Sequence, residues 1–167
     1  MTRTHLLFVL ALFSAAKLWL RTADATDLRW LLWPVDLLVS GATGSYGTWV
    51  PASGYRHADL NVVIDASCAG GNFACITFLL LAYLLLRWRS AWWLIPVAAL
   101  LAVPLTVLAN TARILTLLRV GDAPGFVDAG VWHQGWGAFV YCCVLLLTGL
   151  VLHYRLPAPV GRHLQSS

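Results

Sequence analysis

Four long apolar runs constrain this chain more than any other feature of its 167-residue sequence. A helix that crosses a bilayer needs about 20 mainly apolar residues, and residues 6–20, 69–86, 92–108 and 135–152 approach or reach that length. Only 11% of all residues are charged, against about 25% in a soluble domain. We therefore expect an all-α, multi-pass transmembrane helix bundle of about four full spans, built as a single domain over 1–167 with 155–167 as a flexible tail.

Three segments need a separate interpretation. Residues 31–39 are apolar but too short to span and contain Pro34 and Asp36, so we expect a re-entrant or interfacial segment there. The third run continues through ANTARILTLL, as one long helix or as two halves. Residues 41–67 are rich in Gly and Ser and include LNVVIDA, a pattern typical of a short strand. This stretch is predicted to be a folded outer-face loop region that leads the chain to Cys68.

The connectors between the runs predict which ends lie together. The link RWRS (87–90) is short and basic, and Arg3 and the segment after His153 fall on the same side as it. The positive-inside rule places that side in the cytoplasm. Residues 21–68 and 109–133, with all seven Asp, then lie outside. Because these outer segments also contain arginines, the Lys and Arg count alone leaves the orientation open.

The stretch DASCAGGNF (65–73) places a cysteine just before the second run. The N-terminus of a helix favours a nearby anion, and a cysteine acts as a nucleophile in its thiolate form. Gly70 and Gly71 would let a substrate backbone approach, and Asn72 offers an amide donor. The alternative for Cys68 is a buried structural cysteine that acts as a small hydrophobe.

Asn110 and Arg113 in ANTARI are three residues apart and share one face of a helix. An arginine beside an apolar span is costly unless it is paired, hydrated or used, and its charge persists at any relevant pH. Arg113 could stabilise a thiolate, an oxyanion or a substrate carboxylate, with Asn110 orienting it or donating to the same oxygen. The alternative is that Arg113 reaches out to lipid headgroups.

His133 begins the last run in HQGWGAF and can both accept and return a proton near neutral pH. His57 lies on the same side in the predicted topology and is the rival base. This topology brings Cys68, Asn110, Arg113 and His133 to one membrane surface from three helix ends. The residues therefore predict a cysteine nucleophile that is assisted by a cation and a base.

The stretches SCAGGNF, ANTARI and HQGWGAF resemble, in this order, the exosortase/archaeosortase family of multi-pass membrane cysteine transpeptidases. The small size of the chain and the form of the cysteine motif look most like the short exosortase K branch. The resemblance covers residues 60–150. It implies that Cys68 is the nucleophile, Arg113 the cationic stabiliser and His133 the proton-transfer residue.

The resemblance also implies a location and a partner. The enzyme would lie in the bacterial cytoplasmic (inner) membrane with its active site on the outer, periplasmic face. Its partner would be a membrane-anchored substrate protein with a C-terminal sorting helix, which is cleaved through a thioester. A nucleic-acid partner is not expected, because the basic residues are scattered. We expect no cofactor, and no metal, because only Cys68 and His133 could serve as ligands of a site that needs several.

Rival interpretations remain for the same residues. A non-enzymatic transporter or partner subunit would use Arg113 and Asn110 to line a polar path. A thiol-disulfide protein is disfavoured by the absence of a C-x-x-C pair, and an inactive member of the family is a further alternative.

Overall fold

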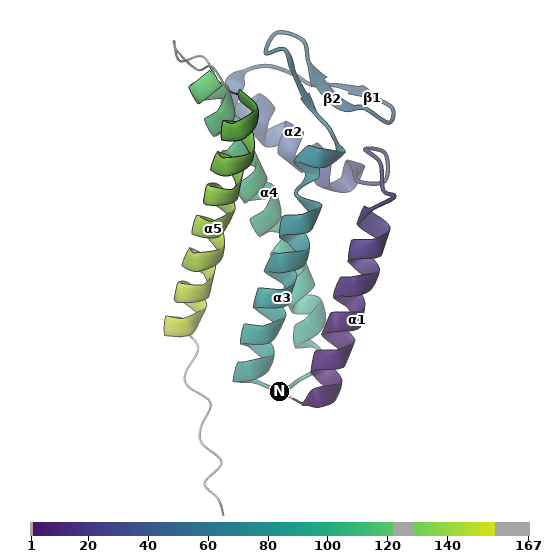
Figure 1. Cartoon of the computed structure of the whole chain (residues 1–167), viewed down its shortest axis with the longest axis vertical. Helices are drawn as coiled ribbons and strands as arrows, with labels where there is room; N and C mark the ends of the chain where they lie inside the picture. The colour runs from purple at the N-terminus through teal and green to yellow at the C-terminus, as the bar shows by residue number, and fades with distance from the viewer. Residues whose placement is uncertain (1, 122–128, 156–167) are drawn as a thin grey trace, which may run out of the picture.

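Four long helices run along the molecule in the computed structural model of the chain, which describes residues 2–121 and 129–155 and the side chains of 2–119 and 138–155 (Figure 1). The four are α1 (Arg3–Leu20), α3 (Gly71–Trp88), α4 (Leu94–Gly121) and α5 (Ala129–Arg155). Each contains a stretch long and apolar enough to cross a membrane. The prediction of an all-α, multi-pass bundle with four spans is confirmed.

The third run forms one continuous helix, which decides between the two alternatives left by the sequence. Helix α4 extends from Leu94 to Gly121 and contains Pro104. A proline within a helix removes one backbone hydrogen bond, yet α4 continues through it. Asn110 and Arg113 therefore lie on the same uninterrupted helix as the span below them.

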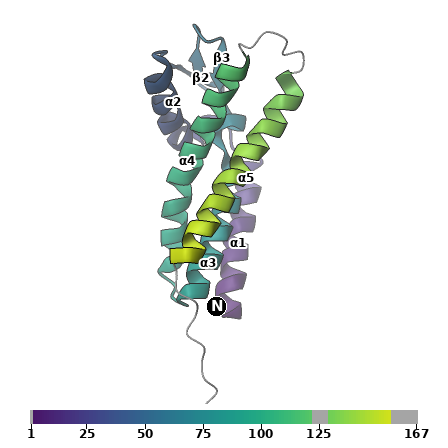
Figure 2. The same cartoon turned by 90° about the vertical axis from the view of Figure 1, so that its left-hand side faces the viewer.

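Helix α3 lies at the centre of the bundle and packs against α1, α4 and α5. Figure 2 shows α5 crossing the bundle obliquely beside α3 and α4. The lower part of α3 and the start of α4 share an apolar core that includes Leu81, Leu86 and Leu94, each at most 2% exposed. The burial of these side chains closes the lower half of the α3–α4 interface.

The segment predicted to be re-entrant or interfacial is a regular helix, α2 (Arg29–Thr43), with Pro34 inside it. It lies across the end of the bundle that is uppermost in Figure 1, called the upper end below. Its inner face buries Leu32, Val35 and Val39 completely or nearly so, while Trp30 and Trp33 are exposed. This one-sided burial is what a helix lying along a membrane interface requires.

A small antiparallel sheet follows α2 at the upper end. It consists of β1 (Thr48–Val50), β2 (Gly54–His57) and β3 (Val62–Ile64), in the order β1-β2-β3. Strand β3 is the short strand predicted in LNVVIDA, so that prediction is confirmed. Gly54 has a φ of +106°, and a Cβ there would lie 2.2 Å from the carbonyl oxygen of Ile64. Only glycine fits this close approach between β2 and β3.

A buried polar cluster fastens this sheet to α2. The Nε2 of His57 lies 2.9 Å from Oδ1 of Asp36, and its Nδ1 lies 2.9 Å from Oγ of Ser45. The hydroxyl of Ser45 donates to Asp59 at 2.5 Å. Burial raises the pKa of Asp36, and the hydrogen bond from His57 opposes that rise. A Cβ on Gly47 would come within 2.1 Å of Asp36 Oδ1. The contact between Asp36 and His57 therefore requires glycine at position 47.

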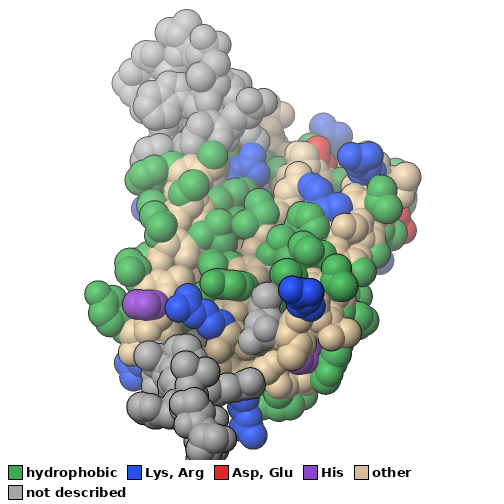
Figure 3. All heavy atoms as spheres, turned by 60° about the horizontal axis from the view of Figure 1, so that its bottom comes forward, with side chains coloured by type: hydrophobic (Ala, Val, Ile, Leu, Met, Phe, Trp, Pro, Cys, Tyr) green, Lys and Arg blue, Asp and Glu red, His purple; other side chains and the backbone are tan. Residues whose placement is uncertain are grey.

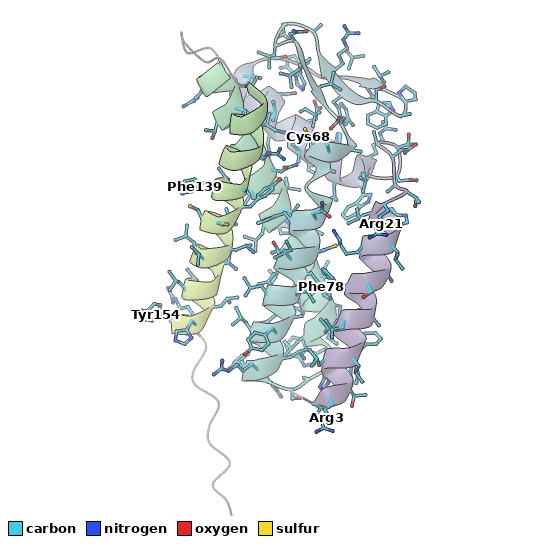
Figure 4. All side chains as sticks on the ribbon, viewed as in Figure 1. Arg3, Arg21, Cys68, Phe78, Phe139 and Tyr154 are labelled. Atoms are coloured by element: carbon cyan, nitrogen blue, oxygen red, sulfur yellow. The ribbon has the colours of Figure 1, made fainter. Side chains whose placement is uncertain are left out.

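The two ends of the bundle differ in charge and in content. Figure 4 places Cys68 and Arg21 at the upper end and Arg3 and Tyr154 at the opposite, lower end. The α3–α4 connector with exposed Arg87 and Arg89 also lies at the lower end. In the view onto that end, acidic side chains are seen only toward the far, upper side (Figure 3). The start of α1, the end of α5 and the α3–α4 connector therefore lie together at the lower end, as the sequence predicts.

We predict that Asp36→Ala lowers the stability of the protein by about 2 kcal/mol, which is roughly 4–8 °C in the midpoint of thermal unfolding. The cause is that His57, which is fully buried, would lose the acceptor of its Nε2. Thermal unfolding in detergent, followed by circular dichroism, measures the effect. Asp27→Ala removes an exposed carboxylate from the loop before α2 and is the matched control, with an expected change below about 0.5 kcal/mol. Equal midpoints for the two variants would contradict the role given to the pair.

Candidate functional site

Cys68 lies in a short 3₁₀ helix, η1 (Ala66–Ala69), between β3 and α3. The carboxylate of Asp65 begins this turn, because its Oδ1 accepts hydrogen bonds from the backbone N–H of Ser67 at 2.9 Å and of Cys68 at 3.2 Å. The hydroxyl of Ser67 donates to the same oxygen at 2.6 Å. Side chains that bond to nearby backbone N–H groups in this way stabilise a turn. Asp65 thereby shapes the turn that presents the partly buried thiol of Cys68.

Gly70 and Gly71 join this turn to α3 at a point where other helices approach closely. Gly70 has a φ of +68°, and a Cβ there would lie 3.3 Å from Cγ of Asn110. On Gly71 a Cβ would lie 2.6 Å from a methyl group of Leu20. The two glycines were predicted to leave room for a substrate; in the structure they also allow the turn to pack against α4 and α1.

Asn110 and Arg113 of α4 are linked by the hydroxyl of Tyr141 on α5. The Tyr141 hydroxyl donates to Oδ1 of Asn110 at 2.5 Å and accepts from Nη1 of Arg113 at 3.4 Å. The ring of Tyr141 stacks on Phe73 of α3, with centroids 4.3 Å apart. The guanidinium carbon of Arg113 lies 5.7 Å from the centre of the same ring. Three helices are therefore connected through one phenol group.

The amide nitrogen of Asn110 has an unused hydrogen-bonding capacity. Asn110 is 0% exposed, and its Nδ2 has no hydrogen-bond partner among the described residues. This nitrogen lies 3.5 Å from the position that a Cβ on Gly70 would occupy, so it faces the turn that carries Cys68. An unpaired buried N–H group is costly, and a ligand oxygen would satisfy it.

A polar cavity of about 360 Å³ lies between this turn and the Arg113–Tyr141 pair. Its walls come from the Cys68 turn and the start of α3, from α4 and α5, and from the chain around the end of α1; they include Ser67, Gly70, Gly71, Asn72, Arg113 and Tyr141. Burial raises the pKa of the Cys68 thiol, the charge of the Asp65 carboxylate raises it further, and the Arg113 guanidinium opposes both with a smaller effect. Within the part of the chain that the structure describes, no three His, Cys, Asp or Glu side chains are placed to hold a metal ion.

The structure brings most of the predicted site residues to one end of the bundle. Gly70, Gly71 and Arg113 line the cavity. Cys68 and Asn110 do not line it themselves, but Cys68 follows the lining residue Ser67 and Asn110 packs behind Gly70. Asn72 lines it as well, but its side chain is exposed and its Oδ1 accepts a hydrogen bond from Lys17 of α1. Asn72 therefore connects α3 to α1.

The structure describes the side chain of only one of the two histidines that the sequence offers as a base. His57 is enclosed in the polar cluster under the sheet, where it contacts Asp36 and Ser45. His133 belongs to α5, about two helical turns before Tyr141, and its side chain lies outside the described residues. The proton-transfer role of His133 stays a prediction.

Tyr141 is the site residue that the sequence interpretation missed. It stands in YCCVLLL, inside an apolar run, where a tyrosine passes as a packing residue. Its one distinguishing feature is a hydroxyl group, which needs a partner when it is buried in a membrane. Asn110 in the preceding span also needs a hydrogen-bond partner. That shared requirement is a signal from which Tyr141 and Asn110 could have been predicted to pair.

Comparison with known proteins gives a match to a protein family. The sequence profile described as transmembrane exosortase, of the EpsH type, matches residues 4–149. No curated protein and no solved structure matches the chain.

We predict that Gly70→Ala destabilises the protein by about 1–2 kcal/mol, because alanine would have to adopt a left-handed conformation against Thr106 and Asn110. Gly41→Ala is the matched control. A Cβ there meets no atom within 4 Å, and the position lies in α2, so we expect a gain of about 0.5–1 kcal/mol. Thermal unfolding of both variants measures the effects, and a loss of stability in Gly41→Ala as large as that in Gly70→Ala would refute this reading of the turn.

Proposed function

The chain belongs to the transmembrane exosortase family, which suggests a membrane transpeptidase, and we propose that it cleaves the C-terminal sorting signal of exported proteins with Cys68 as its nucleophile. One observation supports the proposal above all others. The turn that holds Cys68 and the Arg113 side chain line one polar cavity at one end of an apolar bundle. The amide nitrogen of Asn110, which has no hydrogen-bond partner among the described residues, lies behind Gly70 in the wall of that cavity.

In the proposed reaction, the Cys68 sulfur attacks the scissile carbonyl carbon of the substrate. His133 takes the thiol proton and gives it to the departing amine as the C–N bond breaks, which leaves a thioester on Cys68. Water, or the amine or hydroxyl of an acceptor, then attacks the thioester carbon. The C–S bond breaks, and the proton that the water or acceptor loses on attack goes to the sulfur.

The developing oxyanion needs hydrogen-bond donors that are in place before the reaction. Arg113 supplies a permanent charge, and Tyr141 fixes its orientation by accepting from Nη1. The Asn110 amide supplies a neutral donor that is already removed from water. The same cation opposes the rise in the pKa of the Cys68 thiol that burial and the Asp65 carboxylate cause, so Arg113 would assist both the nucleophile and the oxyanion.

The proposed orientation places this cavity on the outer, periplasmic face of the bacterial cytoplasmic membrane. The basic α3–α4 connector and the exposed Arg3 lie at the opposite end, which agrees with a cytoplasmic lower end by the positive-inside rule. The partner is then a membrane-anchored substrate protein whose sorting helix crosses the same bilayer. Holding the substrate beside the enzyme in the membrane raises its effective concentration at Cys68.

The shape of the described bundle favours an enzyme over a transporter. A transporter would need a polar path that continues through the bilayer. Below the polar cavity, α3 and α4 instead share the apolar core around Leu81, Leu86 and Leu94.

We predict that Cys68→Ala abolishes processing of a tagged exported protein that ends in a sorting helix, with a rate loss on the order of 10³ or more. Cys142→Ala, which removes an exposed cysteine on α5, should process normally. Immunoblots of membrane fractions give the ratio of cleaved to intact substrate and show that each variant is inserted. Continued cleavage by Cys68→Ala would exclude the proposed nucleophile.

Substitutions of Arg113 and Tyr141 are predicted to slow substrate cleavage by different amounts. Arg113→Lys keeps the charge but loses the planar fork, and we expect processing to fall about 100-fold. Tyr141→Phe keeps the ring stacked on Phe73 but removes the hydroxyl that links Asn110 and Arg113, with an expected loss of about tenfold. Tyr154→Phe is the matched control, because that tyrosine is 83% exposed at the lower end. Initial cleavage rates measure the series, and a full rate in both site variants would contradict the proposed oxyanion site.

A further inference from the structure

An apolar groove of about 530 Å³ runs along the bundle between α1, α3 and α4, beneath the polar cavity. It is open to the surrounding bilayer on one side. Its lining on the three helices includes Phe8, Leu12 and Ala16 of α1, Ala74 and Phe78 of α3, and Ala99 of α4. No function has been assigned to this groove so far.

The groove and the polar cavity adjoin, and the contact between Leu20 of α1 and Gly71 of α3 separates them. The Leu20 side chain has to turn aside before a chain can pass from one to the other. Leu20 and Gly71 line both of them. Trp30 and Leu31 of α2 also line the groove, and α2 lies across the upper end of the bundle (Figure 1). A chain bound in the groove therefore meets α2 at the upper end. Its shortest path toward Cys68 passes Leu20 and Gly71.

The dimensions of the groove indicate how much of an occupant it can hold. From Phe8 to Leu20 the lining follows α1 for about 18 Å of helical rise. The volume of about 530 Å³, spread over about 18 Å, gives a cross-section of roughly 30 Å². A whole helix, which is about 10 Å wide, does not fit inside. A row of side chains from one face of a helix does.

Four of the residues that line the groove on α3 and α4 are small. They are Gly71, Ala74, Ala99 and Ala102, and they stand among larger residues such as Phe78 and Ile95. Small residues are typical of helix–helix interfaces in membranes, because they let two backbones approach closely. An acyl chain packs on any apolar surface and gains no comparable advantage from small residues, so these four positions favour a polypeptide helix over a lipid.

We propose that this groove binds the transmembrane helix of the polypeptide substrate, a proposal that rests on the function proposed above. One face of the substrate helix inserts between α1 and α4, and α2 ends its upward path. The chain then leaves the helical conformation and passes Leu20 and Gly71 into the polar cavity. Non-helical backbone at membrane depth is tolerated where protein or water surrounds it, and an unwound peptide exposes its carbonyl group to Cys68.

A second apolar groove on the other side of α3 provides a comparison within the same molecule. It has a volume of about 420 Å³ and lies between α3 and α5, where Ile76, Leu80 and Gly149 line it. It shares no lining residue with the polar cavity. The proposal assigns the substrate helix to the first groove and not to the second.

Disulfide crosslinking distinguishes the two grooves. In a full-length background with Cys68, Cys75, Cys142 and Cys143 replaced by alanine, a single cysteine is introduced as Ala99→Cys or Gly149→Cys. Each variant is reconstituted in liposomes with a 20-residue helix of leucine and alanine that carries one central cysteine. Mild oxidation then links cysteines whose Cα atoms come within about 7 Å, and the product is quantified on non-reducing gels.

The expected result is at least fivefold more crosslinked product with Ala99→Cys than with Gly149→Cys, suppressed by an excess of the same helix without cysteine. Equal crosslinking in both grooves, or none in the first, would overturn the proposal. Suppression of the Ala99→Cys product by added lipid alone, and not by the cysteine-free helix, would assign the groove to an acyl chain instead. Because Cys68 is absent from this background, a negative result leaves the proposed chemistry intact, and a failure of the chemistry leaves this result unaffected.

Discussion

A completely buried amide on α4 determines how the upper half of this bundle is assembled. Asn110 is surrounded by apolar helices, where an unmet hydrogen-bonding group is expensive. The Tyr141 hydroxyl donates a hydrogen bond to Oδ1 of Asn110 and accepts one from Nη1 of Arg113. The Tyr141 side chain thus links α5 to α4, contacts the Arg113 guanidinium and stacks on Phe73. The other half of the amide, Nδ2, is left facing the Cys68 turn.

The residues outside the cavity hold its parts in place. Asp65 organises the turn that contains Cys68 by accepting from its backbone N–H groups. The chain that leads into this turn comes from the small sheet, which the Asp36–His57 pair fastens to α2. Helix α2 in turn closes the end of the bundle. The polar groups at the upper end thus form two separate sets, one that supports the architecture and one that surrounds the cavity.

Much of this arrangement could be predicted from the sequence, for identifiable reasons. The four spans follow from hydrophobic length alone, and Cys68 and Arg113 are conspicuous because polar groups beside apolar spans are rare. Helix α2 was expected only as a re-entrant or interfacial segment. Its proline and aspartate obscure a helix whose stability comes from burying Leu32, Val35 and Val39. His57 looked as available as His133, since a sequence does not show that a residue 21 positions earlier, Asp36, will enclose it. Tyr141 was missed because its partner lies 31 residues away on another helix.

The central claim is that Cys68 and Arg113 form one site, in which the Arg113 charge opposes the rise in the pKa of the Cys68 thiol that burial and Asp65 cause. Alkylation of Cys68 by iodoacetamide at neutral pH, followed by mass spectrometry, tests this claim most directly, because the reagent reacts with the thiolate. The rate should fall several-fold in Arg113→Gln and remain close to that of the unmodified protein in Arg113→Lys, while the exposed Cys142 in the same molecules reacts at an unchanged rate. An identical Cys68 rate in all three proteins would contradict the claim, and Cys68 and Arg113 would then not form one site.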